Sequence, residues 1–135
     1  MVVFDSSPLI HLTQIGKIGF ITQLFDEIYI PNAVYKEVIE QGNIKGESDA
    51  KFLQQFIEQK KIKCDNVKEN NKILFGVVHD GEREAINLAY QKSDVLIVDD
   101  KKARMIAEQL GIKFHGTLGI LYMLYDEKII DRALY

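Results

Sequence analysis

Acidic side chains follow two apolar runs of the sequence, at the point where each run ends. The run 2–4 leads directly into Asp5, and the run 95–98 leads into Asp99 and Asp100. If both runs are strands of a parallel sheet, their carboxyl ends share one edge, and these carboxylates are predicted to converge there. Two carboxylates about 4 Å apart repel each other by roughly 4 kcal/mol at an effective dielectric constant near 20. Several together therefore require shared protons or a bound cation.

Two further acids lie on predicted helices. In the helix expected at 79–91, apolar residues follow Glu82 at +3, +4 and +7, so Glu82 lies on the buried stripe and Glu84 points roughly to the opposite side. In the helix expected at 33–41, Glu37 lies on the border of the apolar face. A purely structural role is also open for both acids, because the helix dipole favours a glutamate in a first turn and glutamates at such a border are usually solvated.

The acidic side chains predicted to face inward are suited to binding a hard cation. The inward-leaning acids are Asp5, Glu37, Glu82, Asp99 and Asp100. Ligation by oxygen alone suits Mg²⁺ or Mn²⁺, and such an ion can bind phosphate, activate water and stabilise a leaving oxygen. The residues therefore indicate metal-dependent hydrolysis of phosphodiester bonds. A helix cap is the competing role for Asp99 and Asp100, and we expect it to explain one of them but not both.

Short apolar runs alternate with helical patterns along the chain, and this alternation positions the acids. Strands are expected at 2–4, 27–30, 62–64, 95–98 and 112–114. Helices are expected through 9–12 and at 17–25, 33–41, 46–60, 79–91, 101–110 and 118–125, with a loop at 68–72. Strands that alternate with helices predict βαβ units and a parallel sheet with helices on both faces.

Length and composition set the outer limits. With 135 residues, 47% of them hydrophobic and 27% charged, the chain is expected to form one domain over 1–135. No apolar run approaches the roughly 18 residues of a membrane span, and no signal peptide is evident, so we expect a cytoplasmic protein. Cys64 is the single cysteine, and the net charge of −3 excludes a generally basic nucleic-acid binder.

Other phosphate chemistries fit the sequence less well. In an aspartyl-phosphate phosphatase a second aspartate usually stands two residues after the first, and Ser7 occupies that place here. A response-regulator receiver is disfavoured because its acidic pair belongs near the first strand. A nucleotide-binding fold is weakly supported, since neither GxxxxGK[ST] nor GxGxxG occurs.

Four acidic segments in this order resemble the PIN-domain ribonucleases, which include the VapC-type toxins of prokaryotic toxin–antitoxin pairs. The resemblance extends over essentially the whole chain. It is carried by "VVFDSSPLI", "IPNAVYKEVIE", "GEREAINLA" and "LIVDDKKAR". The "GE" of the third segment and the "GTLGIL" at 116–121 are similar to one PIN subgroup.

The resemblance implies a Rossmann-like α/β/α sandwich with a central five-stranded parallel sheet. It also implies a Mg²⁺ or Mn²⁺ site made by Asp5, Glu37, Glu82 and Asp100, with Ser6 hydrogen-bonding beside the first aspartate. The third acid is commonly aspartate in the family, whereas this chain has Glu82. The fourth segment commonly holds one aspartate; the spacing from Glu82 favours Asp100 and leaves Asp99 as an auxiliary ligand or a cap.

The remaining expectations concern the surroundings of the acids. Thr117 is expected to cap the last helix or to hold a metal-bound water. The three histidines, His11, His79 and His115, are not expected to be ligands. Four cationic side chains flank the acids and either hold RNA phosphates or form solvated helix faces: Arg83, Lys101, Lys102 and Arg104.

By analogy with the family, the expected function is that of an endoribonuclease toxin with a cognate antitoxin partner and a homodimeric assembly. A PIN-like domain that binds a partner without catalysis is the non-enzymatic alternative.

Overall fold

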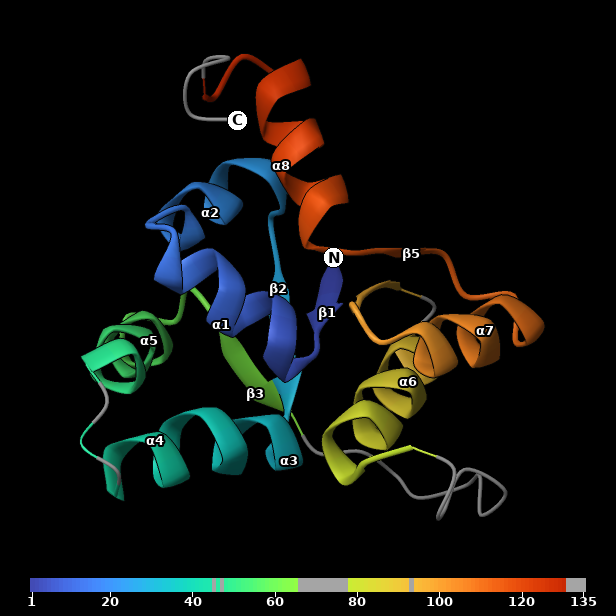
Figure 1. The fold of residues 1–135 in the computed structure, drawn as a ribbon, viewed down its shortest axis with the longest axis horizontal. Helices are drawn as coiled ribbons and strands as arrows, with labels where there is room; N and C mark the ends of the chain where they lie inside the picture. Colours follow the sequence, from blue (N-terminus) through green and yellow to red (C-terminus); the bar gives the residue numbers. More distant parts are fainter. Residues whose placement is uncertain (45, 47, 66–77, 93, 131–135) are drawn as a thin grey trace.

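Five parallel strands form the centre of the computed structural model (Figure 1). They are β1 (Val2–Phe4), β2 (Ile28–Pro31), β3 (Lys63–Asp65), β4 (Val95–Ile97) and β5 (Phe114–His115), in the spatial order β3-β2-β1-β4-β5. The structure describes residues 1–44, 46, 48–65, 78–92 and 94–130. The predicted five-stranded parallel α/β fold is confirmed, while the loop predicted at 68–72 lies outside the described residues.

Helices connect the strands and cover the sheet. They are α1 (Ser6–Gln14), the 3₁₀ helix η1 (Ile18–Phe20), α2 (Ile21–Leu24), α3 (Asn32–Tyr35), the π-helical turn η2 (Lys36–Glu40), α4 (Gln41–Ile44), α5 (Ser48–Glu58), α6 (Asp80–Lys92), α7 (Lys101–Gln109) and α8 (Thr117–Asp126). Among the described residues, no helix has the length and apolar character needed to cross a bilayer.

Alternating side chains of the strands belong to two separate hydrophobic clusters, one on each face of the sheet. Val2 and Phe4 pack with helices α1, α2, α5 and α8 on one face of the sheet. Val3, between them, packs with α6 and α7 on the other face. This is the period-two alternation of a strand that is buried on both sides, and it makes β1 the centre of both clusters.

The order of the strands fixes where a ligand can bind. From β1 the chain moves outward through β2 to β3, and it then returns to place β4 on the opposite side of β1. The connections that follow β1 and β4 therefore diverge, and they leave a crevice at the carboxyl ends of these two strands.

The structure corrects several predicted boundaries. The helix expected at 17–25 is divided into η1 and α2, and Gly19 lowers the helix propensity at that point. The helix expected at 33–41 continues to residue 44 and contains the wider turn η2. The last strand begins at Phe114 instead of residue 112, and Ile112 before it is buried in the hydrophobic cluster with α6 and α7.

Candidate active site

The carboxyl ends of β1 and β4 carry the first acids of the site. Phe4 pairs with Ile97, and the amide of Asp5 donates to the Ile97 carbonyl at 2.9 Å, so Asp5 lies beside the segment that leads to Asp99 and Asp100. A groove of 340 Å³ opens at this edge. It is lined by Asp5, Ser6, Ser7, His11, Glu37, His79, Glu82, Asp99 and Asp100. All five acids predicted to lean inward therefore lie around one groove.

Gly81 in the first turn of α6 leaves room where three oxygen atoms meet. A β-carbon at Gly81 would lie 3.2 Å from Oε2 of Glu37. The same point is 3.6 Å from Oδ1 of Asp5 and 3.6 Å from Oγ of Ser6. The Ser6 hydroxyl also donates to Oε2 of Glu37 at 2.9 Å, which joins α1 to the turn η2. The glycine of the "GE" segment thus keeps this cradle of oxygens open.

Glu82 and Asp100 line the same groove beside this cradle. Glu82 accepts a hydrogen bond from the His79 amide at 3.1 Å, and Asp100 caps α7 by accepting from the Ala103 amide at 2.9 Å. Burial raises the pKa of Glu82, and the charge of Asp100 and a side-chain hydrogen bond between the two carboxyl groups raise it further, against the lowering effect of the His79 amide. Both acids therefore cap their own helices while they also face each other.

Asp5 is the electrostatic centre of the group. Asp5 is only 4% exposed, and this burial is the main cause that raises its pKa to about 7. The charges of Glu82, Glu37 and Asp100 add to this increase, and the hydrogen bond from the Ser6 amide opposes it. All four acids of the expected metal site thus interact electrostatically at Asp5, which is the situation that a divalent cation relieves.

Asp99 has a different role from its neighbour. Its Oδ1 accepts from the Thr117 amide at 2.7 Å, and its Oδ2 accepts from the Thr117 hydroxyl at 2.6 Å. Burial acts to raise the pKa of Asp99, but these bonds, together with the hydrogen bond and charge of His11, outweigh it and lower the pKa. As expected, only one of the two aspartates, Asp100, caps α7, and Asp99 instead accepts from the first amide of α8, which is the capping role left open for it.

Thr117 was expected to cap its own helix or to hold a water molecule. The cap position of α8 is occupied by Gly116, and the Thr117 hydroxyl instead donates to Asp99 across the sheet edge. Thr117 therefore fixes the carboxylate of Asp99 and joins the starts of α7 and α8.

His11 lies in the groove, although no role was expected for it. Its Nδ1 is 2.9 Å from Oδ2 of Asp99, and its side chain is 52% exposed. The signal in the sequence was its position on α1, one helical turn after Ser7, which also lines the groove. That spacing places Ser7 and His11 on the same side of α1, the side that faces the groove.

Glu84 holds the helix that leads to Glu37. It was expected to point away from the site; it lies outside the groove lining, and its Oε1 accepts a hydrogen bond from the amide of Ala33, at the start of α3, at 2.9 Å. Glu37 follows in η2, and π-helical turns of this kind occur frequently at functional sites. The contact between α6 and α3 thus sets the position of Glu37 from a residue outside the groove.

Two of the four expected RNA contacts have structural roles. Arg83 is 9% exposed and pairs with Asp80 at 2.9 Å, which leaves little of it available to RNA. Arg104 donates from Nε to the Val98 carbonyl at 3.1 Å, and its guanidinium lies 5.7 Å from the centre of the Phe114 ring. Lys101 and Lys102, next to Asp100, are exposed.

The donor set fits a hard divalent cation. Across the described ranges, no three His, Cys, Asp or Glu side chains are already drawn together closely enough to hold a metal. The four acids that couple to Asp5 nevertheless offer only oxygen donors, and the cradle at Gly81 brings atoms of two of them around one point. A cation held by Asp5, Glu37, Glu82 and Asp100 would draw their carboxylates closer.

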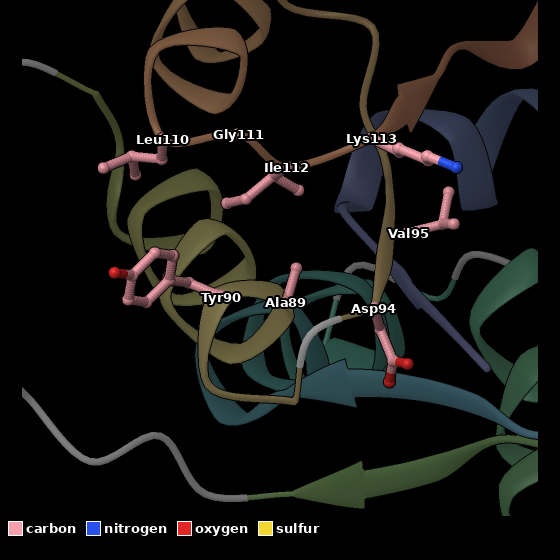
Figure 2. A pocket seen from close by; sticks show the side chains of 8 residues that line it. All are labelled: Ala89, Tyr90, Asp94, Val95, Leu110, Gly111, Ile112 and Lys113. Carbon is pink, nitrogen blue, oxygen red and sulfur yellow. The ribbon is translucent and has the colours of Figure 1, made fainter.

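A second, larger hollow lies at the opposite edge of the sheet. Figure 2 shows this space of 720 Å³ between the ends of α6 and α7 and the starts of β4 and β5. Its lining mixes apolar and polar groups, with Leu110 and Ile112 above Ala89, while the side chains of Asp94 and Lys113 point away from them. It lacks the convergent acids of the smaller groove, so the candidate site remains at the carboxyl edge.

A family model described as a PIN domain matches residues 1–134. The chain belongs to the PIN-domain family. PIN domains are generally nucleases, and they typically use a divalent metal ion. The acidic groove therefore lies in a domain of the type that cleaves nucleic acids.

Solved structures show the same PIN fold. A PilT N-terminus domain protein from the hyperthermophilic archaeon Sulfolobus solfataricus P2 is 18% identical, with a TM-score of 0.64 over 90% of this chain and 91% of that one. A domain of a functionally unknown protein from Methanocaldococcus jannaschii DSM 2661 is 21% identical, with a TM-score of 0.57 over 85% and 89% of the two chains. Among curated proteins, no sequence matches the chain.

Replacing Asp5 should make the metal-free PIN domain more stable at alkaline pH. In the folded state the pKa of Asp5 is about 7 instead of 3.8, so folding favours its protonated form. This contribution is complete below pH 4 and is lost as the pH rises through 7. We expect Asp5→Asn to raise the free energy of unfolding at pH 8 by about 2 to 4 kcal/mol and to change it little at pH 4.

Urea denaturation in EDTA at both pH values measures the effect, with the exposed Asp26→Asn as the control. An equal difference between wild type and Asp5→Asn at the two pH values would contradict the buried, protonated state of Asp5.

A methyl group at Gly81 should weaken metal binding without unfolding the domain. The methyl of Gly81→Ala would press on Oε2 of Glu37 at 3.2 Å, so Glu37 must move within the cradle. We expect the Mn²⁺ affinity to fall about tenfold, whereas the melting temperature is kept or rises because alanine favours a helix. Gly19→Ala, whose methyl meets Phe56 at 3.9 Å, is the matched control. Unchanged Mn²⁺ affinity in Gly81→Ala would show that the cradle is not part of the metal site.

Proposed function

We propose that this PIN domain is a Mg²⁺- or Mn²⁺-dependent endoribonuclease. The observation that carries the proposal is the electrostatic coupling of Glu37, Glu82 and Asp100 to the buried Asp5 in one groove. The generally nucleolytic chemistry of the family supports it. A bound ion would supply the positive charge that a phosphodiester needs and would lower the pKa of the attacking water.

Different residues around the groove position the acids and attract the RNA. Asp5 and Glu37 are positioned by Ser6, through its amide and its hydroxyl respectively. Asp100 is held by its cap to α7, next to the exposed Lys101 and Lys102, which would attract the phosphate backbone of RNA. The acids would thus hold the cation, and the lysines would offset the acidity of the groove towards a polyanion.

The shape of the surface supports cleavage inside a strand. A further hollow of 390 Å³, distinct from the one at the opposite edge of the sheet, adjoins the groove and shares Glu37 and His79 with it. It extends away from the acids along Lys36 and Gln41. A strand can therefore pass over the acids with nucleotides on both sides, as an endonuclease requires.

We further propose, from the resemblance to VapC-type toxins, a toxin role in the cytoplasm with a cognate antitoxin and a homodimeric assembly. Leu118, Tyr122 and Tyr125 are exposed on α8 at the spacing of one helical face, which is suitable for contact with a protein partner.

The oligomeric state tests the assembly directly. We expect light scattering after size exclusion to give twice the chain mass of 15.5 kDa, and Tyr122→Lys on the exposed face of α8 to shift the protein towards monomer. A monomeric wild type would remove the homodimer from the proposal and leave the nuclease assignment untouched.

Cleavage of RNA tests the nuclease assignment. With Mn²⁺, wild type should cut an internally labelled, unstructured RNA, and Asp5→Asn and Asp100→Asn should each lose at least about 10³-fold in rate because each removes a charge that holds the ion. Asp26→Asn should cleave like wild type.

Retained cleavage in Asp5→Asn would refute the mechanism. A folded wild type that binds partners but neither Mn²⁺ nor RNA would favour the non-catalytic alternative, and trapping of Asp5 by beryllium fluoride would favour an aspartyl-phosphate phosphatase.

A further inference from the structure

His11 has no part in the proposed metal site, yet the structure holds it at the rim of the groove. Its Nδ1 is 2.9 Å from Oδ2 of Asp99, and Asp99 is itself fixed by the amide and hydroxyl of Thr117. We refer to His11, Asp99 and Thr117 as the histidine bracket. The His11 side chain remains half exposed, so the bracket orients the ring without covering it.

The bracket determines which ring nitrogen carries the proton. Both carboxylate oxygens of Asp99 act as acceptors, since Oδ1 accepts from the Thr117 amide and Oδ2 from the Thr117 hydroxyl. Its contact with His11 therefore requires a hydrogen on Nδ1. Thr117 uses its single hydroxyl hydrogen at 2.6 Å from Asp99 and lies 3.5 Å from Nδ1, so it does not compete for this position. In the neutral ring, Nε2 then has a lone pair and acts as an acceptor.

An acceptor at this place needs a hydrogen-bond donor from the substrate, and the donor next to the phosphate in the strand is the sugar hydroxyl. Phosphate oxygens only accept hydrogen bonds, whereas the ribose of RNA carries a 2′-hydroxyl that donates. Asp5, at the bottom of the groove, is 4% exposed, while the His11 side chain is 52% exposed at the rim. A phosphate placed over the acids would therefore bring its adjoining sugar to the level of His11.

We propose that Nε2 of His11 accepts a hydrogen bond from a ribose 2′-hydroxyl of the bound strand, and that the histidine bracket thereby distinguishes RNA from DNA. This inference rests on the proposed function, because it assigns the sugar contact of the same groove. The competing hydroxyl donor at this position is water, which would be present with either sugar.

The test compares sugars on an unchanged base sequence at about pH 8.5, where an ordinary imidazole is neutral. Wild type should cleave an unstructured RNA about threefold to tenfold faster than the same RNA with one 2′-deoxy sugar beside the cleaved bond. This factor corresponds to the loss of one neutral hydrogen bond. His11→Ala should cleave the all-ribose strand more slowly than wild type by the same factor. On the deoxy strand, His11→Ala and wild type should cleave at the same rate. His11→Gln, whose amide oxygen can accept in the same place, should recover part of the preference, and His115→Ala is the control outside the groove.

Two outcomes would overturn the inference. In one, His11→Ala slows both strands equally and the preference of the enzyme for ribose persists, so that His11 acts on water or on structure. In the other, wild type is indifferent to 2′-deoxy substitution at every position.

Binding keeps the inference testable without catalysis. Fluorescence anisotropy of a labelled RNA and of the uracil-containing DNA of identical sequence should show a preference for RNA in wild type and none in His11→Ala. If wild type cleaves no RNA, the proposed function fails, while this binding ratio still decides whether His11 reads the ribose. Equal binding ratios in wild type and His11→Ala would exclude that role.

Discussion

The structure depends on one electrostatic constraint, the burial of several carboxyl groups at the carboxyl edge of β1 and β4. Asp5 is placed there by the backbone of the central strand, in a position that water barely reaches. Burial raises its pKa to about 7 and three further acids add to the increase, so below about pH 7 the metal-free groove keeps a proton that an exposed aspartate would lose. A fold tolerates such a cluster when protons or a cation compensate the charge, and the second of these makes the cluster useful for phosphodiester chemistry.

Much of this arrangement follows from the sequence. Alternating apolar runs and helical patterns predict the parallel sheet, and the acids at 5, 37, 82 and 100 lie around one groove as expected. What the sequence could not show depends on contacts between distant segments. Asp99 caps a helix that begins 18 positions later, and Glu84 reaches α3 from 51 positions away. Local periodicity contains no information about such pairs, so it left Asp99 as a cap or an auxiliary ligand without naming its partner, and it gave Glu84 an orientation but no contact.

The groove has two parts with separate physical roles. On one side the oxygens of Asp5 and Glu37 meet at the space left by Gly81, where a shared proton or a cation would compensate their charge. On the other side the carboxylate of Asp99 is fully engaged with Thr117 and His11 and serves as an anchor. Two adjacent aspartates therefore differ in function because their partners differ: Asp100 faces Glu82, and Asp99 faces α8.

Calorimetry with Mn²⁺ is the most direct test of the central claim that acids from separate strands and helices share one cation. Wild type, Asp5→Asn, Asp100→Asn and the control Asp26→Asn would be titrated at pH 8 without RNA. We predict binding by wild type and Asp26→Asn, and loss of binding in both site variants, since each removes a carboxylate from the same site. Unchanged binding in either site variant would contradict the account, because the ion would then be held elsewhere on the chain.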